Sequence, residues 1–260
     1  MVSQSKVEEH ARRMEAYVYQ FGLRVQQGTE SMIQEISSHI MAELSLKKGL
    51  IRQTPENAAK VLEVELVFQR ELSKSGFYVE VMALVHGFVD QVDEFRTLYD
   101  EMGNLPEMEL NEDDREILAN QAAAAIAVIE GHASKVSVNL RHFLARSLGD
   151  ITQSTLVSGV INVVRKVNQV EPIAKDQMIL WFRLLAHLSY RHAEELGYNL
   201  KYRYVGPYDE KSRDFCDKLL RSSSFRRDEI ASLDNGQVAD AFVNGGGYNC
   251  KHFWVAEPMA

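Results

Sequence analysis

The sequence predicts a mainly α-helical protein, with a long-helix body of at least five helices and a small C-terminal α+β module. Two observations predict this class. Apolar residues recur at steps of three and four over most of residues 6–197, which is the spacing of a buried helix face. After residue 198 the pattern changes to alternating residues, turns and glycines. We therefore expect a helical body over 1–197 and a Cys/His-containing module over 198–260.

The first helices of the body follow from their caps and breaks. Thr54-Pro55-Glu56 supplies an N-cap, a proline at the first helical position and an acid in the first turn, which predicts a helix to about Lys74. The clearest apolar stripe runs over 77–102. Asn111 then precedes three acids, a sequence typical of a helix N-terminus.

The later helices are marked in the same way. Gly149-Asp150, with Gln153 three residues after the aspartate, is typical of a C-cap followed by a capping box. A last long helix is expected from near Pro172 to Gly197. No strand pattern of weight precedes residue 198.

The C-terminal segment predicts a sheet of two or three strands with short helices. Residues 198–205 alternate bulky and polar side chains as a half-buried strand would, and 251–255 could pair as a final strand. Asp209 can cap a short helix that ends near residue 220, and a second short helix is expected over about 227–233.

Composition narrows the class of protein. The chain has 260 residues, a 45% apolar fraction and a net charge of −8. Residues 201–260 carry nine basic and nine acidic side chains, so the excess of acid lies in the first 200 residues. This argues against a general nucleic-acid binder. Arg221, Arg226 and Arg227 could form a local basic patch, although a solvated face is the favoured interpretation.

The start of the chain and the number of cysteines bear on the compartment in which the protein is made. The N-terminus lacks the apolar segment of a secretory signal, and no run approaches 18 apolar residues, so we expect no membrane span. Two cysteines cannot make a disulfide framework. The chain is therefore expected to be made in a reducing cytoplasm.

Cys216, Cys250 and His252 are the best candidates for a site. Thiolate and imidazole are the usual zinc ligands, and structural zinc sites are closed by four groups. Asp209 is the candidate for the fourth ligand. A module of about 60 residues is marginal without a staple, which favours a structural zinc or a Cys216–Cys250 disulfide. Buried, inert cysteines are the remaining interpretation.

A nucleophilic interpretation uses the same residues. Cys216 would be activated by His252, which Asp209 or Asp234 would orient. No protease signature surrounds Cys216, so this interpretation is disfavoured. Local support for the module is expected from aromatic packing, and the side chains expected to pack are Tyr204, Phe215, Phe225, Tyr248, Phe253 and Trp254.

Three segments of the module carry a resemblance to a known family. Residues 206–216 read GPYDEKSRDFC, residues 225–230 read FRRDEI, and residues 246–254 read GGYNCKHFW. In this order they resemble the C-terminal domain of the minor head, or head morphogenesis, proteins of tailed bacteriophages. Three departures stand out: Ser212 and Arg226 replace threonines, and Lys251 replaces an arginine. The helical residues before 197 carry no matching motif.

The resemblance implies a virion structural or assembly protein that acts by protein–protein interaction, in the minor head or head–tail connector region. It implies no catalysis. Implied partners are other phage structural proteins (portal, capsid or connector), with self-association as a further option, and neither a membrane nor nucleic acid is expected as a partner. The implied location is the host cytoplasm during assembly and then the virion. The alternative is a cysteine- or metal-dependent hydrolase acting during assembly.

Overall fold

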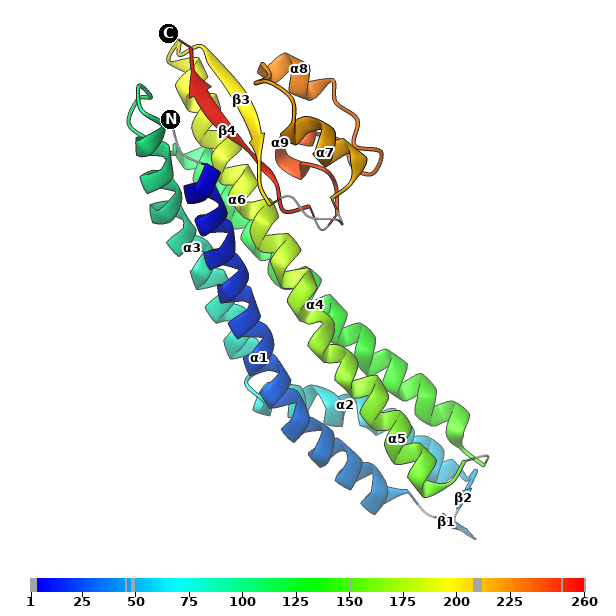
Figure 1. Ribbon diagram of the computed structural model, residues 1–260. Coiled ribbons are helices and arrows are strands. Elements are labelled where there is room, and N and C mark those ends of the chain that lie inside the picture. Colours follow the sequence, from blue (N-terminus) through cyan, green and yellow to red (C-terminus); the bar gives the residue numbers. More distant parts are fainter. Residues whose placement is uncertain are drawn as a thin grey trace. The chain divides into compact units, whose positions relative to one another are not determined.

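The computed structural model describes residues 4–44, 46–47, 50–149, 151–207, 212–248 and 250–259. It confirms a mainly helical chain with a small C-terminal module that contains two antiparallel strands (Figure 1). The elements in chain order are α1 (Gln4–Glu43), β1 (Leu46–Lys47), β2 (Leu50–Ile51), α2 (Pro55–Lys74), α3 (Phe77–Met102), α4 (Glu112–Ser147), α5 (Gln153–Val164), the 3-10 helix η1 (Arg165–Gln169), α6 (Val170–Glu195), β3 (Leu200–Val205), α7 (Asp214–Leu220), α8 (Arg227–Ala231), α9 (Ala241–Asn244) and β4 (Phe253–Pro258).

The chain divides into two compact units, and long helices contribute residues to both. The first unit comprises Met1–Val18, Val85–Ala125 and Ala174–Ala260, and the second comprises Tyr19–Leu84 and Ile126–Ile173. The strands and short helices after residue 198 thus belong to one unit with most of α6 and parts of α1, α3 and α4. The boundary expected near residue 197 stays a prediction.

The helix starts show how local sequence sets the boundaries. The Thr54 hydroxyl accepts a hydrogen bond from the Asn57 backbone N–H, and Pro55 is the first residue of α2, as predicted. Asn111 and Asp114 cap α4 reciprocally, each side chain accepting from the other's backbone N–H. The cap of α5 differs from the prediction. Thr152 accepts from the backbone N–H of Thr155, so the helix begins after Thr152, while Asp150 lies outside the described residues.

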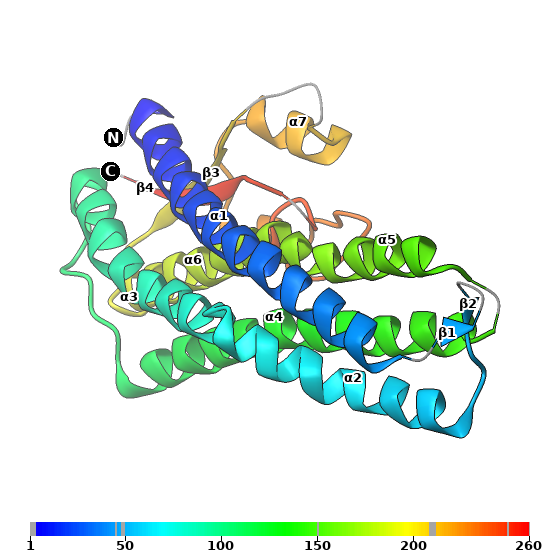
Figure 2. The same cartoon turned by 90° about the horizontal axis from the view of Figure 1, so that it is seen from below.

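The second unit contains α2, α5 and parts of α1, α3 and α4. A short hairpin of β1 and β2 follows α1 (Figure 2). The Ile51 N–H donates to the Ile151 carbonyl, so the hairpin is held beside the start of α5. No strand was predicted in this region, because two-residue strands leave no alternating pattern. Phe143 of α4 packs so closely on α5 that a Cβ at Gly159 would overlap its ring.

The first unit has an aromatic core that joins the helices to the module. Phe182 of α6 packs edge-on against Phe95 of α3, with ring centroids 5.4 Å apart, and against Phe253 of β4 at 5.1 Å. The ring of Tyr190, also on α6, has its centroid 5.6 Å from that of Tyr202 on β3. All these side chains except Phe253 are less than 2% exposed, and Phe253 is 3% exposed. The module therefore shares its core with α3 and α6.

The strands of the module pair antiparallel, with Tyr204 opposite Trp254 and Val205 opposite Phe253. The predicted alternation of β3 is confirmed, since Leu200, Tyr202 and Tyr204 are buried and Lys201 is exposed. On the other side of β3, Tyr202 forms a single antiparallel bridge with Phe225.

Two boundaries in the module differ from the prediction. The short helix expected from a cap at Asp209 begins at Asp214, with Arg213 at the N-cap position, and Asp209 lies outside the described residues. The final strand covers 253–258 instead of 251–255, because residues before Phe253 form the loop of the site described below. α8 retains half of a capping box, in which the Glu229 carboxylate accepts from the Arg226 N–H.

The aromatic residues of the module are buried to different degrees. Trp254, Tyr204 and Phe253 are buried as predicted. The prediction was wrong for Tyr248, whose side chain is 64% exposed because the loop turns it outward. Arg221, Arg226 and Arg227 each pair with an acidic side chain, namely Asp217, Asp228 and Glu194. Within the described part of the chain, no helix is sufficiently long and apolar to cross a bilayer.

Candidate metal centre

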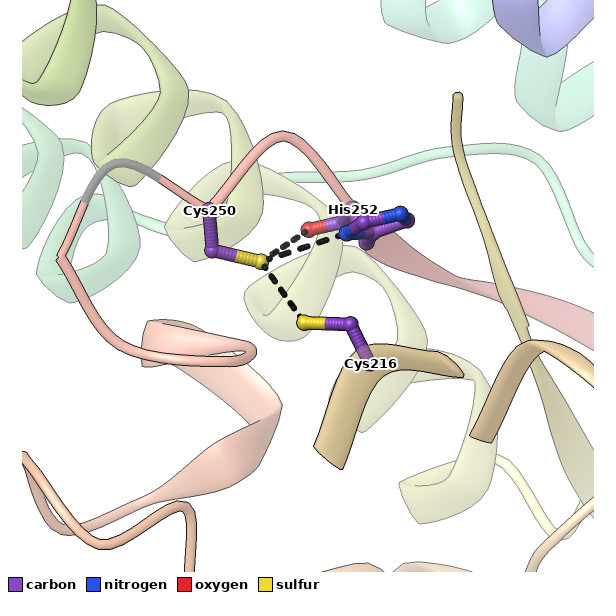
Figure 3. A group of neighbouring side chains, drawn as sticks. All are labelled: Cys216, Cys250 and His252. Atoms are coloured by element: carbon purple, nitrogen blue, oxygen red, sulfur yellow. Dashed lines mark hydrogen bonds between the residues drawn. The ribbon is translucent and has the colours of Figure 1, made fainter. Parts of the chain in front are cut away.

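Cys216, Cys250 and His252 form one buried cluster (Figure 3). Their ligand atoms, the two sulfurs and a ring nitrogen, all lie within 4.8 Å of one another. The three side chains are 2%, 6% and 4% exposed. Cys216 comes from the first turn of α7, and the other two come from the loop before β4. The clustering predicted from the sequence is confirmed.

The separations within the cluster match the edges of a zinc tetrahedron. Zinc–sulfur bonds of about 2.3 Å and zinc–nitrogen bonds of about 2.0 Å place tetrahedral ligands roughly 3.8 Å apart for two sulfurs and roughly 3.5 Å apart for sulfur and nitrogen. The Cys216 and Cys250 sulfurs are 3.8 Å apart, and Cys250 Sγ is 3.5 Å from His252 Nδ1. The thiols are free, so the predicted disulfide is not formed. Both of these separations fit a bound zinc ion.

The His252 ring is oriented for ligation by its second nitrogen. Nε2 lies 2.8 Å from the Pro207 carbonyl oxygen, which can only accept, so Nε2 carries the proton. Nδ1 then keeps its lone pair toward Cys250 (Figure 3). A backbone carbonyl that fixes the ring in this way is the usual support of a metal-binding histidine. Gly206 allows the approach, because a Cβ there would lie 2.6 Å from His252 Cδ2.

The two thiols differ in their readiness to lose a proton. The hydrogen bond from the Cys216 thiol lowers the pKa of Cys250, and the Arg183 guanidinium lowers it further. The hydrogen bond to Cys250 and burial raise the pKa of Cys216. The backbone N–H of Gly246 also donates to Cys250 Sγ at 3.2 Å. Cys250 is therefore the sulfur prepared to carry negative charge.

A tyrosine hydroxyl completes the cluster. Tyr204 Oη lies 3.2 Å from Cys250 Sγ and 3.7 Å from Cys216 Sγ. Its ring stacks on His252, with centroids 5.3 Å apart, and packs against Trp254 at 4.7 Å. Among the described residues, the hydroxyl has hydrogen-bond contacts only with the two sulfurs.

Arg183 of α6 holds the loop that carries the ligands. Its guanidinium donates to the carbonyl oxygens of His252 at 2.8 Å, Cys250 at 2.7 Å and Asn244 at 3.1 Å. The residue is only 5% exposed. Because three carbonyls from one loop converge on one planar cation, the guanidinium fixes the positions of Cys250 and His252.

Further polar side chains complete the loop. Arg213 donates to the carbonyls of Gly246 and Tyr248. The Asn235 amide donates to the Gly245 carbonyl at 2.9 Å, and its oxygen accepts from the backbone N–H groups of Gln237 and Val238, in the turn that follows Asn235. Gly246 itself is needed for space, since a Cβ there would overlap the Cys216 sulfur. The glycine run thus allows a close approach of the backbone to a sulfur atom.

Not every predicted site residue joins the cluster. Asp209 lies outside the described residues, so its role as fourth ligand stays a prediction. Asp234 is exposed and its carboxylate accepts from the Gly236 N–H in a turn, so it does not orient His252. The sequence pattern did not indicate that Arg183 belongs to the site, and it indicated Tyr204 only as a packing residue. A single cation between Phe182 and Leu184, in an apolar stretch, was the available signal for Arg183.

The arrangement favours a structural role for the cluster. A catalytic thiol must meet its substrate, and a catalytic zinc keeps one position open to water. Here both sulfurs and the imidazole are buried, and the space beside them is taken by a tyrosine hydroxyl. The cluster can hold a metal and thereby join α7 to the loop before β4.

The comparisons with known proteins add no family. No family model, no curated protein and no solved structure matches this chain.

Proposed function

We propose that this chain is a structural or assembly protein of a tailed-bacteriophage virion, in the minor head or head–tail connector region, and that it acts by protein–protein interaction. The observation that carries the proposal is the placement of the three segments with the family resemblance. The first and third meet in one closed cluster and the second packs against β3 and β4, so the shared residues are those that build the module.

Each segment contributes to the module. The first supplies Cys216 and the loop-binding Arg213. The second supplies Phe225, which bridges to β3 and packs edge-on against Trp254 with centroids 5.6 Å apart. The third supplies Cys250 and the metal-facing histidine. Residues that pack the module and form its buried cluster support a structural role for these segments more than a catalytic one.

We further propose that the cluster holds a structural zinc ion. Cys216, Cys250 and His252 would bind it, and the ion would supply a crosslink between α7 and the loop before β4. Because metal binding is coupled to folding in small modules, the zinc would stabilise the strand pair and the short helices. Residues 198–260 have few long elements of their own, which is the setting in which such a crosslink contributes most.

Tyr248 is the side chain through which the module would contact a partner. It lies in the third segment, between Gly247 and the ligand loop, yet its side chain is 64% exposed. An exposed tyrosine on a rigid loop is typical of the residues that dominate protein interfaces. Its backbone is fixed at both polar atoms, by the Gln237 side chain and by Arg213.

The direct test is the composition of assembled particles. Particles from the strain that encodes the chain are purified on successive density gradients and analysed by quantitative mass spectrometry. The proposal predicts that the chain stays at a constant ratio to the major capsid protein, and that neighbouring genes encode portal, terminase and capsid proteins. A chain that remains in the particle-free fraction at every step would contradict it.

An interface variant makes the test specific. Tyr248→Ala should lower incorporation of the chain, whereas Tyr19→Ala, which changes a 50% exposed tyrosine on α1, should not. Equal incorporation of both variants would exclude Tyr248 as a partner contact. Circular dichroism of both variants confirms that each remains folded.

The alternative is a cysteine- or metal-dependent hydrolase, and the 3.5 Å contact between Cys250 and His252 is the observation that favours it. Burial of both residues weighs against it. The two functions separate in Cys216→Ala. A hydrolase would lose processing of a substrate while particles still contain the chain, whereas a structural protein would lose incorporation.

A further inference from the structure

We propose that Tyr204 is the fourth zinc ligand and that it binds as a phenolate, in a centre whose net negative charge is balanced by Arg183. This inference rests on the zinc centre proposed above and specifies how it is completed. Three observations support it: the position of the hydroxyl, the way in which β3 holds it, and the charge of the surroundings.

The hydroxyl occupies the position of a tetrahedral vertex. With zinc–oxygen bonds of about 2.0 Å, a ligand oxygen lies roughly 3.5 Å from each sulfur ligand. Tyr204 Oη is 3.2 Å from one sulfur and 3.7 Å from the other. Without a metal, the hydroxyl can donate to one sulfur and accept from the other thiol, and the same position suits a ligand oxygen. Proximity to both sulfurs is what a fourth ligand requires.

The strand pair holds this oxygen in place. Tyr204 lies opposite Trp254 in the β3–β4 ladder, and His252 is two residues before Trp254. Diagonal neighbours on one face of a strand pair approach closely, which explains the stacking of the Tyr204 ring on the His252 ring. The tyrosine is 2% exposed, so water does not compete for its hydroxyl from open solvent.

The charge of the site calls for an anionic centre. Arg183 is 5% exposed and donates to three carbonyl oxygens, and among the described residues no carboxylate forms a salt bridge with it. A buried cation without a counter-charge is costly. A Cβ placed on Gly245 would lie 3.0 Å from the Arg183 guanidinium carbon and 3.2 Å from Cys250 Sγ, so the cation and the cluster are close neighbours.

The phenolate balances the charge of the centre against that of Arg183. Zinc with two thiolates and one neutral imidazole is uncharged and leaves Arg183 without a counter-charge. When the Tyr204 proton also leaves, the divalent ion and three anionic ligands carry one net negative charge, which Arg183 neutralises. Zinc binding would thus release to solvent the phenol proton and whatever protons the two sulfurs still carry.

The test adds zinc to the metal-free full-length protein and records the ultraviolet difference spectrum of tyrosinate. The wild-type chain should develop the tyrosinate band in proportion to bound zinc. Tyr204→Phe should bind zinc without the band, and with an affinity lowered by about tenfold or more. Tyr202→Phe is the matched control, because Tyr202 is a buried tyrosine on the same strand whose hydroxyl bonds to Glu194 instead of sulfur.

Each outcome has a distinct meaning. A tyrosinate band in the wild type, Tyr202→Phe and Asp209→Asn, and none in Tyr204→Phe, supports the inference. Zinc binding to the wild type without a tyrosinate band would overturn it and leave the zinc centre standing, and a loss of affinity in Asp209→Asn would then identify the carboxylate as the ligand. Failure of the wild type to bind zinc would remove the centre and this inference together.

Discussion

Replacing Arg183 by methionine should destabilise the unit that contains the metal-binding loop. Methionine matches much of the length of the arginine side chain but cannot donate a hydrogen bond. The change therefore removes the donors to the carbonyls of Asn244, Cys250 and His252 at once. It keeps the apolar part of the side chain among the residues of α6.

The magnitude follows from the number of bonds and from the burial of the cation. Hydrogen bonds to a charged group contribute about 1.5 to 3 kcal/mol each, so three of them amount to roughly 4 to 9 kcal/mol. Methionine also avoids the desolvation of a buried guanidinium, which offsets several kcal/mol. We expect a net loss of about 2 to 5 kcal/mol, a large part of the total stability of an ordinary domain.

The assay combines urea unfolding with hydrogen exchange resolved by peptide. Urea unfolding gives the loss of free energy, and exchange shows where it falls, which should be the peptides covering 244–252. Arg96→Met is the control, because Arg96 is 51% exposed and pairs with the 84% exposed Asp93. An exposed pair of this kind contributes about 1 kcal/mol or less.

Equal losses for Arg183→Met and Arg96→Met would refute the reasoning. So would faster exchange spread evenly over the chain with no focus on 244–252. Either result would mean that the three carbonyls are solvated as well by water as by the guanidinium, and that the loop does not depend on α6.

Two further predictions concern a glycine and a histidine. Gly246→Ala should destabilise the chain by about 1 to 3 kcal/mol and speed labelling of Cys216 by a thiol reagent, because the new methyl group overlaps the Cys216 sulfur. Gly131→Ala should instead stabilise the chain by about 0.5 to 1 kcal/mol, because a Cβ at this position meets no described atom within 4 Å. Burial, with the Arg227 cation 3.1 Å away, lowers the pKa of His187 from 6.5 to about 4. In that window the unfolded chain binds a proton that the folded chain excludes, so the free energy of unfolding should fall as pH drops from 6.5 toward 4, and urea titrations should show a smaller fall in His187→Gln.

The helices were predicted well because the caps that begin them consist of residues adjacent in the sequence. Thr54 and Pro55 fix the start of α2, and Asn111 fixes the start of α4. The error at α5 has the same origin, since Asp150 and Thr152 are both good caps and only the path of the chain selects Thr152. A pattern of caps cannot decide between two adequate candidates.

The sequence predicted the three candidate metal ligands, but it did not predict the side chains that surround them. Cys216, Cys250 and His252 were indicated by residue type alone, since thiols and imidazole in a short module favour a metal. Arg183 and Tyr204 come from a long helix and a strand whose patterns indicate only burial. Their roles depend on which atoms the tertiary fold brings within 4 Å, and spacing along the chain carries no record of that.

Zinc content is the measurement that tests the central claim most directly. The full-length protein, purified without chelators, should contain an equimolar amount of zinc by elemental analysis. Cys250→Ser should contain little or none, and should show loosened exchange after residue 198 while its helical circular dichroism stays near that of the wild type. A wild-type protein free of zinc, whose stability is unchanged when zinc is added, would contradict the account.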